Sequence, residues 1–269
     1  MGNGIAHVAA LAGCQVELID ISEGQLQKAE AAITTNLDRQ LKKNLITQSQ
    51  WENAKANISY ASKLSDSKVK LIIEAVSENL ALKQKLLAEM DKVVNSDCIL
   101  ATNTSSISIT ELAAATSRPD KVVGLHFMNP VPVMQLVEVI RGLATSEATF
   151  QIASDLVAEF NKTMVVSKDY PGFIVNRILM PMINEAIYAL FEGVATVQDI
   201  DISMKLGTNQ PMGPLALADL IGLDTCLAIM QVLHQGFSDS KYRPCPLLIN
   251  YVNAGWLGRK SGKGFYSYI

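Results

Sequence analysis

The chain has 269 residues, of which 49% are hydrophobic and 18% charged, and its formal net charge at pH 7 is −3. The high apolar and moderate charged fractions exclude a disordered chain, and the negative net charge gives no indication of a basic surface that would bind nucleic acid. No apolar run reaches the roughly 18 residues that a membrane-spanning helix needs, so we expect no membrane partner either.

The first predicted elements are a helix and a strand typical of a dinucleotide-binding βαβ unit. The small-residue segment from Gly2 to Gly13 predicts a helix that opens on a glycine, and Cys14 to Asp20 predicts an apolar strand that ends in an acid. In the G-x-G-x-x-G fingerprint the last glycine opens the helix, and an acid about twenty residues later binds a ribose diol. Gly2 and Asp20 match these positions. Asp20 also fits a simpler role, in which it caps the next turn.

The first strand and the G-x-G of the intact unit do not precede Gly2. We interpret the chain as truncated at its N-terminus. A helix N-terminus alone replaces only part of the backbone donors that a pyrophosphate needs, so we expect weak cofactor binding and a tendency to aggregate.

Strands and helices then alternate as far as residue 166, which predicts a Rossmann-like doubly wound α/β domain over residues 1–167. The continuous apolar run Val69–Val76 is typical of a strand buried on both faces of a sheet. The other expected elements are helices at 22–45, 79–94 and 146–161, a short helix after a capping box at 108–111, and strands at 58–60, 98–101, 122–125, 135–140 and 164–166.

From residue 168 to 269 no convincing strand appears before the last few residues, so we expect an all-helical C-terminal domain. Pro171 fits a first-turn proline after an Asp169 cap, and the helix that follows ends at Gly193. Further helices are expected at 196–206 and 214–236. The glycine-rich segment 255–266 fits a tail that packs its aromatic residues better than a phosphate loop.

Polar residues follow two of the predicted strands. Asn103 to Ser106 lies just past a strand, where open α/β sheets bind ligands, although such residues also make ordinary turns and caps. His126 follows the next strand, and Glu138 lies inside the apolar run Leu136–Val139. A buried acid needs a partner, and a carboxylate beside an imidazole orients the ring and raises its basicity. We expect His126 and Glu138 to form a functional pair.

The remaining candidates carry weaker signals. His7 and His234 lie inside predicted helices and fit structural roles, and Asn176, on pattern alone, fits an exposed or back-bonded helix residue. Cys14, Cys98, Cys226 and Cys245 are scattered and form no C-x-x-C pair, so we expect no disulfide framework and no metal site. Together with the lack of a signal peptide, the cysteines favour a cytoplasmic protein.

Several runs, taken together, resemble the L-3-hydroxyacyl-CoA dehydrogenases, and within them the bacterial 3-hydroxybutyryl-CoA dehydrogenase branch. The resemblance extends over essentially the whole chain, and two of the runs are specific to the family. The matching runs are Thr102–Ser106, Gly124–Met134 (GLHFMNPVPVM), Leu136–Val139, Pro171–Arg177 (PGFIVNR), Gly213–Pro214 and the tail from Gly258 to Tyr266.

The resemblance implies a reversible hydride transfer between a 3-hydroxyacyl-CoA and NAD, with NADP as a second possibility. It makes His126 the catalytic base and Glu138 its partner, and it places Ser105 and Asn176 around the C3 oxygen of the substrate. It implies further cofactor contacts for Gly2, Asp20, Glu78, Lys83 and Asn103, and a homodimer formed through the helical domain. No metal is implied.

Three other readings stay open at this point. A β-hydroxyacid dehydrogenase of the 6-phosphogluconate type shares the architecture but normally uses a lysine of its helical domain. A non-catalytic relative such as λ-crystallin is disfavoured by the presence of His126, Glu138, Ser105 and Asn176. The third reading, an acyl-CoA-binding protein without cofactor, is suggested by the missing phosphate loop.

Overall fold

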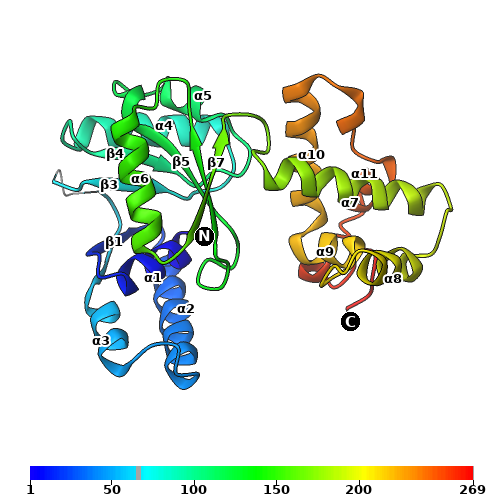
Figure 1. The fold of residues 1–269 in the computed structure, drawn as a ribbon, viewed down its shortest axis with the longest axis horizontal. Coiled ribbons are helices and arrows are strands. Elements are labelled where there is room, and N and C mark those ends of the chain that lie inside the picture. The colour runs from blue at the N-terminus through cyan, green and yellow to red at the C-terminus, as the bar shows by residue number, and fades with distance from the viewer. Residues whose placement is uncertain (65–67, 269) are drawn as a thin grey trace. The chain divides into compact units, whose positions relative to one another are not determined.

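The computed structural model describes residues 1–64 and 68–268, which form two compact units, Met1–Tyr170 and Pro171–Ile269 (Figure 1). The division lies just past the expected one at residue 167. The last strand continues to Lys168, which pairs with Arg141, so this residue belongs to the sheet of unit 1.

Unit 1 alternates helices with short strands. Its elements are α1 (Gly2–Leu11), β1 (Val16–Ile19), α2 (Glu23–Lys42), α3 (Gln48–Ala56), β2 (Ile58–Ala61), β3 (Leu71–Glu74), α4 (Leu80–Val93), β4 (Ile99–Thr102), α5 (Ile109–Ala113), the 3-10 turn Pro119–Lys121, β5 (Val122–Phe127), β6 (Leu136–Arg141), α6 (Glu147–Glu159) and β7 (Thr163–Lys168).

The strands of unit 1 form two sheets, a parallel pair β1-β2 and a five-stranded sheet in the order β3-β4-β5-β6-β7. The α/β class is as predicted, but the larger sheet is not wholly parallel, because β5 and β6 pair antiparallel. The segment 128–135 between them is too short for a crossover helix, so β6 returns beside β5 in the opposite direction.

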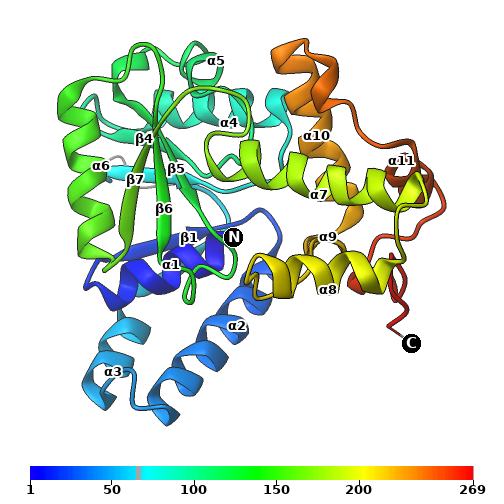
Figure 2. The ribbon, with the colours of Figure 1, turned by 45° about the vertical axis from the view of Figure 1, so that its right-hand side comes forward.

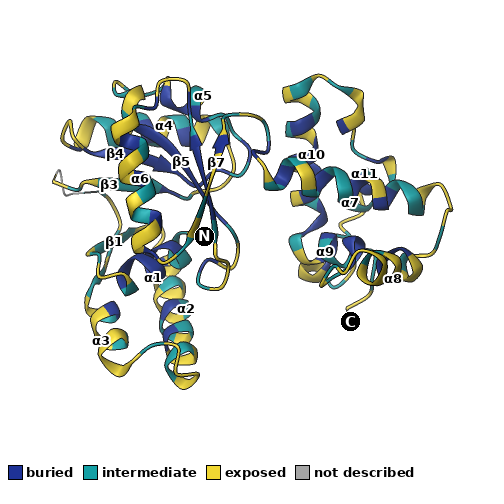
Figure 3. Cartoon of the chain, viewed as in Figure 1, coloured by how far each residue is buried: buried dark blue, intermediate teal, exposed yellow. Residues whose placement is uncertain are grey.

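The core of unit 1 lies on both faces of the larger sheet. Helix α6 packs on β5, β6 and β7, and its Ala153 and Val157 share a buried cluster with Ile5 and Val8 of α1. Helices α4 and α5 lie on the opposite face (Figures 1 and 2). The strands β4 and β5 are buried along their whole length, whereas α2 and α3 project from the sheet with many exposed residues (Figure 3).

Helix α3 was not expected from the sequence, although its start carries a recognisable signal. The side chains and backbones of Thr47 and Gln50 bond reciprocally and form a capping box. Ser22 stands at the N-cap of α2 as predicted, but its side chain makes no cap bond; its backbone N–H donates to Asp20 instead.

Unit 2 is helical, as expected. Its elements are α7 (Val175–Phe191), α8 (Val197–Gly207), α9 (Pro214–Ile221), α10 (Leu223–Phe237), α11 (Pro246–Asn253) and the 3-10 turns Ser240–Tyr242 and Arg259–Ser261. The expected single helix 214–236 is wrong, because Gly222 adopts a φ of +105° and separates α9 from α10 by a bend of 98°. Helix α11 was not predicted.

No single helix of the described residues has the length and apolar composition to cross a bilayer, although the bent pair α9 and α10 passes that test jointly.

Asp169 does not cap the helix that follows Pro171, so this expectation is wrong. That helix, α7, begins only at Val175, after four turn residues. The Asp169 carboxylate instead accepts hydrogen bonds from the N–H groups of Ile109 and Thr110 and from the Ser108 hydroxyl, at 2.7–2.9 Å. It therefore fixes the first turn of α5 inside unit 1.

The C-terminal tail packs its aromatic residues, as predicted. The rings of Phe265 and Trp256 lie 5.1 and 4.9 Å from that of Tyr251. The Asp219 carboxylate accepts from the backbone N–H groups of Phe265 and Tyr266. A Cβ on Gly264 would lie 1.9 Å from Asp219 Oδ1, so only glycine fits at that position.

Candidate active site

His126 and Glu138 face each other across β5 and β6. The two residues are directly paired in the antiparallel register, which places their side chains on the same face of the sheet. The distance from His126 Nδ1 to Glu138 Oε2 is 2.7 Å, and both residues are buried. The structure thus brings together the two side chains that the sequence predicted as a pair.

This contact determines which ring nitrogen can exchange protons. When Glu138 is ionised it accepts the Nδ1–H of His126, which fixes the imidazole tautomer and leaves a lone pair on Nε2. The same carboxylate stabilises the ring when Nε2 takes up a proton. The pair therefore has the arrangement of a general acid–base oriented by a carboxylate.

The loop after β4 lies beside this pair. Asn103 is buried, and its Oδ1 accepts the backbone N–H of Phe127, the residue after His126, at 2.9 Å. The backbone N–H of Ser105 donates to Glu78 Oε1 at 2.8 Å. The segment also forms the turn that its residue types predicted, because Thr104 Oγ1 accepts the N–H of Ile107.

Glu78 and Lys83 belong to one polar cluster at the ends of β3 and β4. Lys83 lies on α4, only 1% exposed, and its Nζ lies 2.9 Å from Oε1 of Glu74 and 3.5 Å from Oε2 of Glu78. Glu74 was not predicted from the sequence as a site residue. The signal was present, because Glu74 is an acid inside the apolar run 69–76, as Glu138 is in its own run.

A second group of residues lies at the N-terminus of α1. A cavity of about 150 Å³ is lined by Asn3 and Gly4 of α1, by Ile33 and Asn36 of α2, and by the segment 129–132. Gly4 is required there, because a Cβ would lie 2.9 Å from Val131 Cβ, whereas one on Gly2 would meet nothing closer than 3.7 Å. The N–H groups that open a helix attract anions such as a diphosphate.

Asp20 follows β1, and its Oδ1 accepts the N–H of Ser22 at 2.8 Å. The turn-capping role of Asp20 is therefore real, and it occupies only one of the two carboxylate oxygens. A carboxylate at the end of this strand and the N-terminus of α1 are part of the donor and acceptor set that binds the ribose and diphosphate of NAD in a βαβ unit. These residues fit the cofactor.

Asn176 lies on α7 in unit 2 and is 7% exposed, so of the two positions that its pattern favoured, exposed or back-bonded, the exposed one is wrong. A role for Asn176 beside the substrate stays a prediction. His7 is also buried, with Nε2 2.9 Å from Gln40 Oε1. Among the described residues no group of three or more His, Cys, Asp or Glu could hold a metal ion.

Two family models match the chain, one for each unit. Residues 1–170 match the model described as "3-hydroxyacyl-CoA dehydrogenase, NAD binding domain". Residues 172–268 match the model described as "3-hydroxyacyl-CoA dehydrogenase, C-terminal domain".

Similar proteins carry related names. A 3-hydroxybutyryl-CoA dehydrogenase of Bradyrhizobium diazoefficiens is 57% identical over all of this chain and 92% of its own length. The mitochondrial hydroxyacyl-coenzyme A dehydrogenase of Mus musculus is 42% identical over all of this chain and 88% of its own length. The crystal structure of (S)-3-hydroxybutyryl-CoA dehydrogenase from Ralstonia eutropha has a TM-score of 0.97 and 51% identity, and the match covers all of this chain and 95% of that one.

Proposed function

The chain belongs to the 3-hydroxyacyl-CoA dehydrogenase family, and from this premise we propose that its preferred substrate pair is 3-hydroxybutyryl-CoA and acetoacetyl-CoA. It is an NAD-dependent oxidoreductase that interconverts 3-hydroxyacyl-CoA and 3-ketoacyl-CoA. The four-carbon preference is supported by relatives named 3-hydroxybutyryl-CoA dehydrogenase that are 57% and 47% identical over the whole chain.

The contact between His126 and Glu138 is the observation that carries the mechanism. In the oxidation direction Nε2 of His126 takes the proton of the 3-hydroxyl group as the C3 hydride leaves. In the reduction direction the protonated ring returns that proton to the C3 oxygen. Glu138 fixes the tautomer of the neutral ring and stabilises the protonated ring. When bound, the nicotinamide ring accepts or donates the hydride.

We assign Ser105 and Asn176 to the C3 oxygen, where a hydroxyl and an amide N–H stabilise the charge that develops in the transition state. The half-buried Ser105 comes from the loop after β4, and Asn176 from the first turn of α7. On the cofactor side, Asp20 and the N-terminus of α1 are proposed to hold the adenosine ribose and the diphosphate.

Oxidation of NADH, followed by its absorbance, tests the function directly. Acetoacetyl-CoA is expected to be turned over with a higher kcat/KM than 3-ketoacyl-CoA esters of eight or more carbons. NADH titrations with and without acetoacetyl-CoA add a binding measurement. Turnover of the long-chain esters alone would contradict the substrate preference, and no turnover of either would favour a non-catalytic acyl-CoA-binding protein.

We further propose that the protein is a homodimer formed through unit 2. Apolar side chains there remain strongly exposed: Ile178 on α7, Val194 after it, and Leu206 on α8, at 66%, 72% and 81%. Burial of these side chains against a second chain would remove their apolar surface from water, which favours association. Light scattering at micromolar concentration is expected to give the mass of two chains, and a monomer mass would refute the proposal.

A cytoplasmic location remains a proposal as well. Its support is chemical: Cys14, Cys98, Cys226 and Cys245 are all free thiols, the state that a reducing compartment maintains. Fractionation of the source cells with an antibody against the protein tests it, and recovery outside the cytoplasmic fraction would contradict it.

A further inference from the structure

The proposed acid–base chemistry leaves one buried ion pair of unit 1 without a role. Lys83 Nζ lies 2.9 and 3.0 Å from the two carboxylate oxygens of Glu74 and 3.2 Å from the carbonyl of Val76. Burying two charges costs free energy that their attraction offsets only in good geometry, so such a pair is weak evidence for stability alone. This pair calls for another explanation.

Glu74 connects the ends of two neighbouring strands. One of its oxygens accepts the backbone N–H of Val76 at 2.6 Å, and the other accepts the Thr102 hydroxyl at 2.7 Å. Glu74 ends β3, and Thr102, its register partner, ends β4. The carboxylate therefore anchors the point at which the chain leaves β4 and enters the loop that carries Ser105.

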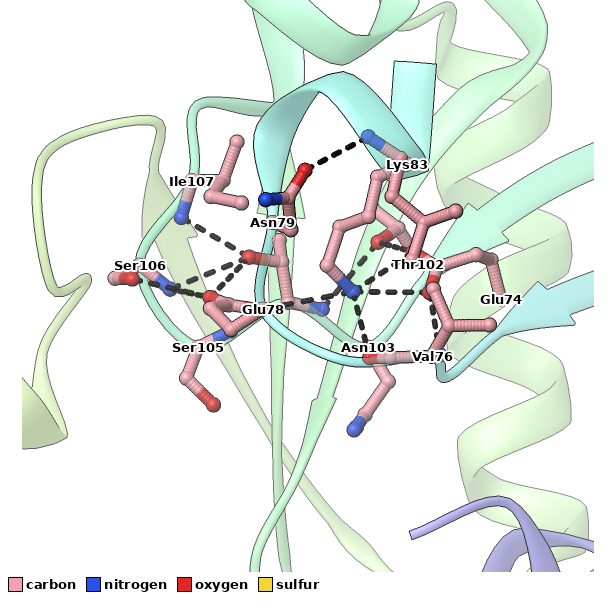
Figure 4. Close-up of polar contacts among 12 residues, drawn as sticks. Glu74, Val76, Glu78, Asn79, Lys83, Thr102, Asn103, Ser105, Ser106 and Ile107 are labelled. Carbon is pink, nitrogen blue, oxygen red and sulfur yellow. Dashed lines mark hydrogen bonds and ion pairs between the residues drawn. The ribbon is translucent and has the colours of Figure 1, made fainter. Parts of the chain in front are cut away.

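Glu78 holds the loop itself. Its Oε2 lies 3.5 Å from Lys83 Nζ, and its Oε1 accepts four hydrogen bonds from the loop. The donors are the Thr104 hydroxyl, the N–H of Ser105 and both the N–H and the hydroxyl of Ser106, at 2.6–3.0 Å. Figure 4 shows these bonds converging on Glu78, with the Ser105 hydroxyl directed away from them.

The loop is also tied to the strand of the catalytic histidine. The N–H of Asn103 donates to the carbonyl of Glu74 at 2.7 Å, and its side chain accepts the N–H of Phe127. Lys83 thus lies at the centre of a set of contacts that runs from α4 through both carboxylates to residues 102–106, and from there to β5.

We propose that Glu74 and Lys83 are positioning residues that set the place of the Ser105 hydroxyl through Thr102 and Glu78. The proposal rests on the function proposed above, in which Ser105 contacts the C3 oxygen of the substrate. A catalytic group on a loop must be held to within about 0.5 Å to be effective, and bonds from a buried charge network supply that restraint.

Lys83→Met tests this assignment, with Lys85→Met as the matched control. Lys85 lies on the same helix, but its side chain is 72% exposed and pairs with the exposed Glu89. With saturating NADH and acetoacetyl-CoA, Lys83→Met is expected to lower kcat by about 10²-fold, the size of effect that misplacement of a catalytic group produces. Lys85→Met is expected to leave kcat unchanged. An effect of Lys83→Met on the KM for NADH alone would overturn the proposal in favour of a cofactor contact.

A double-mutant cycle with Ser105→Ala separates positioning from general destabilisation. If Lys83 acts through Ser105, Lys83→Met in the Ser105→Ala background is expected to change kcat by no more than about twofold. Full additivity of the two losses would overturn the proposal. If Ser105→Ala itself leaves kcat unchanged, the proposed role of Ser105 at the C3 oxygen fails. This outcome can be distinguished from failure of the positioning role of Lys83, which appears as full additivity.

Lys83→Met leaves the carboxylate of Glu74 buried without its cation, so folding is a concern for the single variant. The variant Lys83→Met/Glu74→Gln removes both charges and is expected to recover thermal stability while kcat stays low. Recovery of the wild-type kcat in that variant would show a purely structural pair and overturn the proposal. The half-exposed Glu78, changed to Ala, repeats the test without removing a fully buried charge and is expected to lower kcat as well.

Discussion

Each unit buries two carboxylates among its described residues, but the two units bury them against different partners. In unit 1, Glu138 faces His126 and Glu74 faces Lys83. In unit 2, Asp201 and Asp219 accept hydrogen bonds from backbone N–H groups and tyrosine hydroxyls. The acids of unit 1 meet side chains that carry or exchange protons, and those of unit 2 hold segments of the backbone in place.

The contacts of unit 2 show what a structural carboxylate does. Asp201 binds the N–H groups of Leu215 and Ala216 at the start of α9, and also the Tyr266 hydroxyl. Asp219 binds the N–H groups of Phe265 and Tyr266 in the tail. Burial, together with the bond to Asp201, raises the pKa of Tyr266, which favours the protonated hydroxyl that donates to Asp201. This difference predicts that substitutions of the buried acids of unit 1 change rates and that substitutions of the buried acids of unit 2 change stability.

The largest expected effect is on catalysis. His126→Gln is expected to lower kcat by about 10²–10⁴-fold, the usual contribution of general acid–base catalysis. Glutamine retains a donor for Glu138, so the fold and the melting temperature should change little. The measurement is steady-state oxidation of NADH with acetoacetyl-CoA. A variant with nearly full kcat would mean that another group moves the proton.

Asp219→Asn should have the opposite pattern, with lower stability and a kcat within a few-fold of wild type. The amide of the introduced asparagine side chain can place its own N–H against a backbone N–H of the tail, which then has no acceptor. Each buried donor left without an acceptor lowers the stability by about 1–3 kcal/mol. Urea unfolding measures the loss. Asp224→Asn is the control, because Asp224 is half exposed and its pair with Lys260 contributes only about 0–1 kcal/mol. Equal losses in both variants would contradict the comparison.

Asp20 allows a test on the cofactor side. Asp20→Ser is expected to raise the KM for NADH by about 10- to 100-fold, since hydrogen bonds to a charged group are worth about 1.5–3 kcal/mol. It should also narrow the preference for NADH over NADPH, because the carboxylate no longer repels a 2′-phosphate. If neither the KM for NADH nor the preference for NADH over NADPH changes, Asp20 only caps the turn through Ser22.

The smallest expected effect is on the pH dependence of stability. Burial lowers the pKa of His7 below its ordinary value, and Lys162 adds to this effect, while the bond to Gln40 opposes it. The neutral form is therefore favoured in the folded state. The contribution of the neutral His7 ring to the free energy of unfolding is fully present above pH 6.5. It is lost as the pH falls through the lowered pKa of His7. Melting temperatures from pH 8 to 5 should fall less steeply for His7→Gln, and parallel curves would rule out this contribution.

Much of the site could be predicted from the sequence, for reasons that particular residues show. An acid inside the apolar run 136–139 needed a buried partner, and His126 on the neighbouring strand supplied it across a short connection. The same argument applies to Glu74, but its partner Lys83 lies on a helix nine residues later, and a helical lysine gives no sign that its ammonium turns inward.

The fold was predictable in class and less so in detail. Alternation of strands and helices indicated the α/β unit, but not that β6 runs antiparallel to β5. The break at Gly222 has only a weak local signal, the glycine itself, because a good helix former follows it and the neighbouring Leu223 donates to the distant carbonyl of Leu257. Asp169 looked like a cap for the next helix, but it bonds to α5, about 60 residues earlier.

The most direct test of the proposed acid–base mechanism is a double-mutant cycle on His126 and Glu138, measured as kcat for the reduction of acetoacetyl-CoA by NADH. Because the two side chains act as one unit, Glu138→Gln alone should cost a large part of what His126→Gln costs, and the double variant should lose no more than His126→Gln alone. Losses that multiply in the double variant would show two independent contributions and contradict the assignment of this pair as the acid–base group.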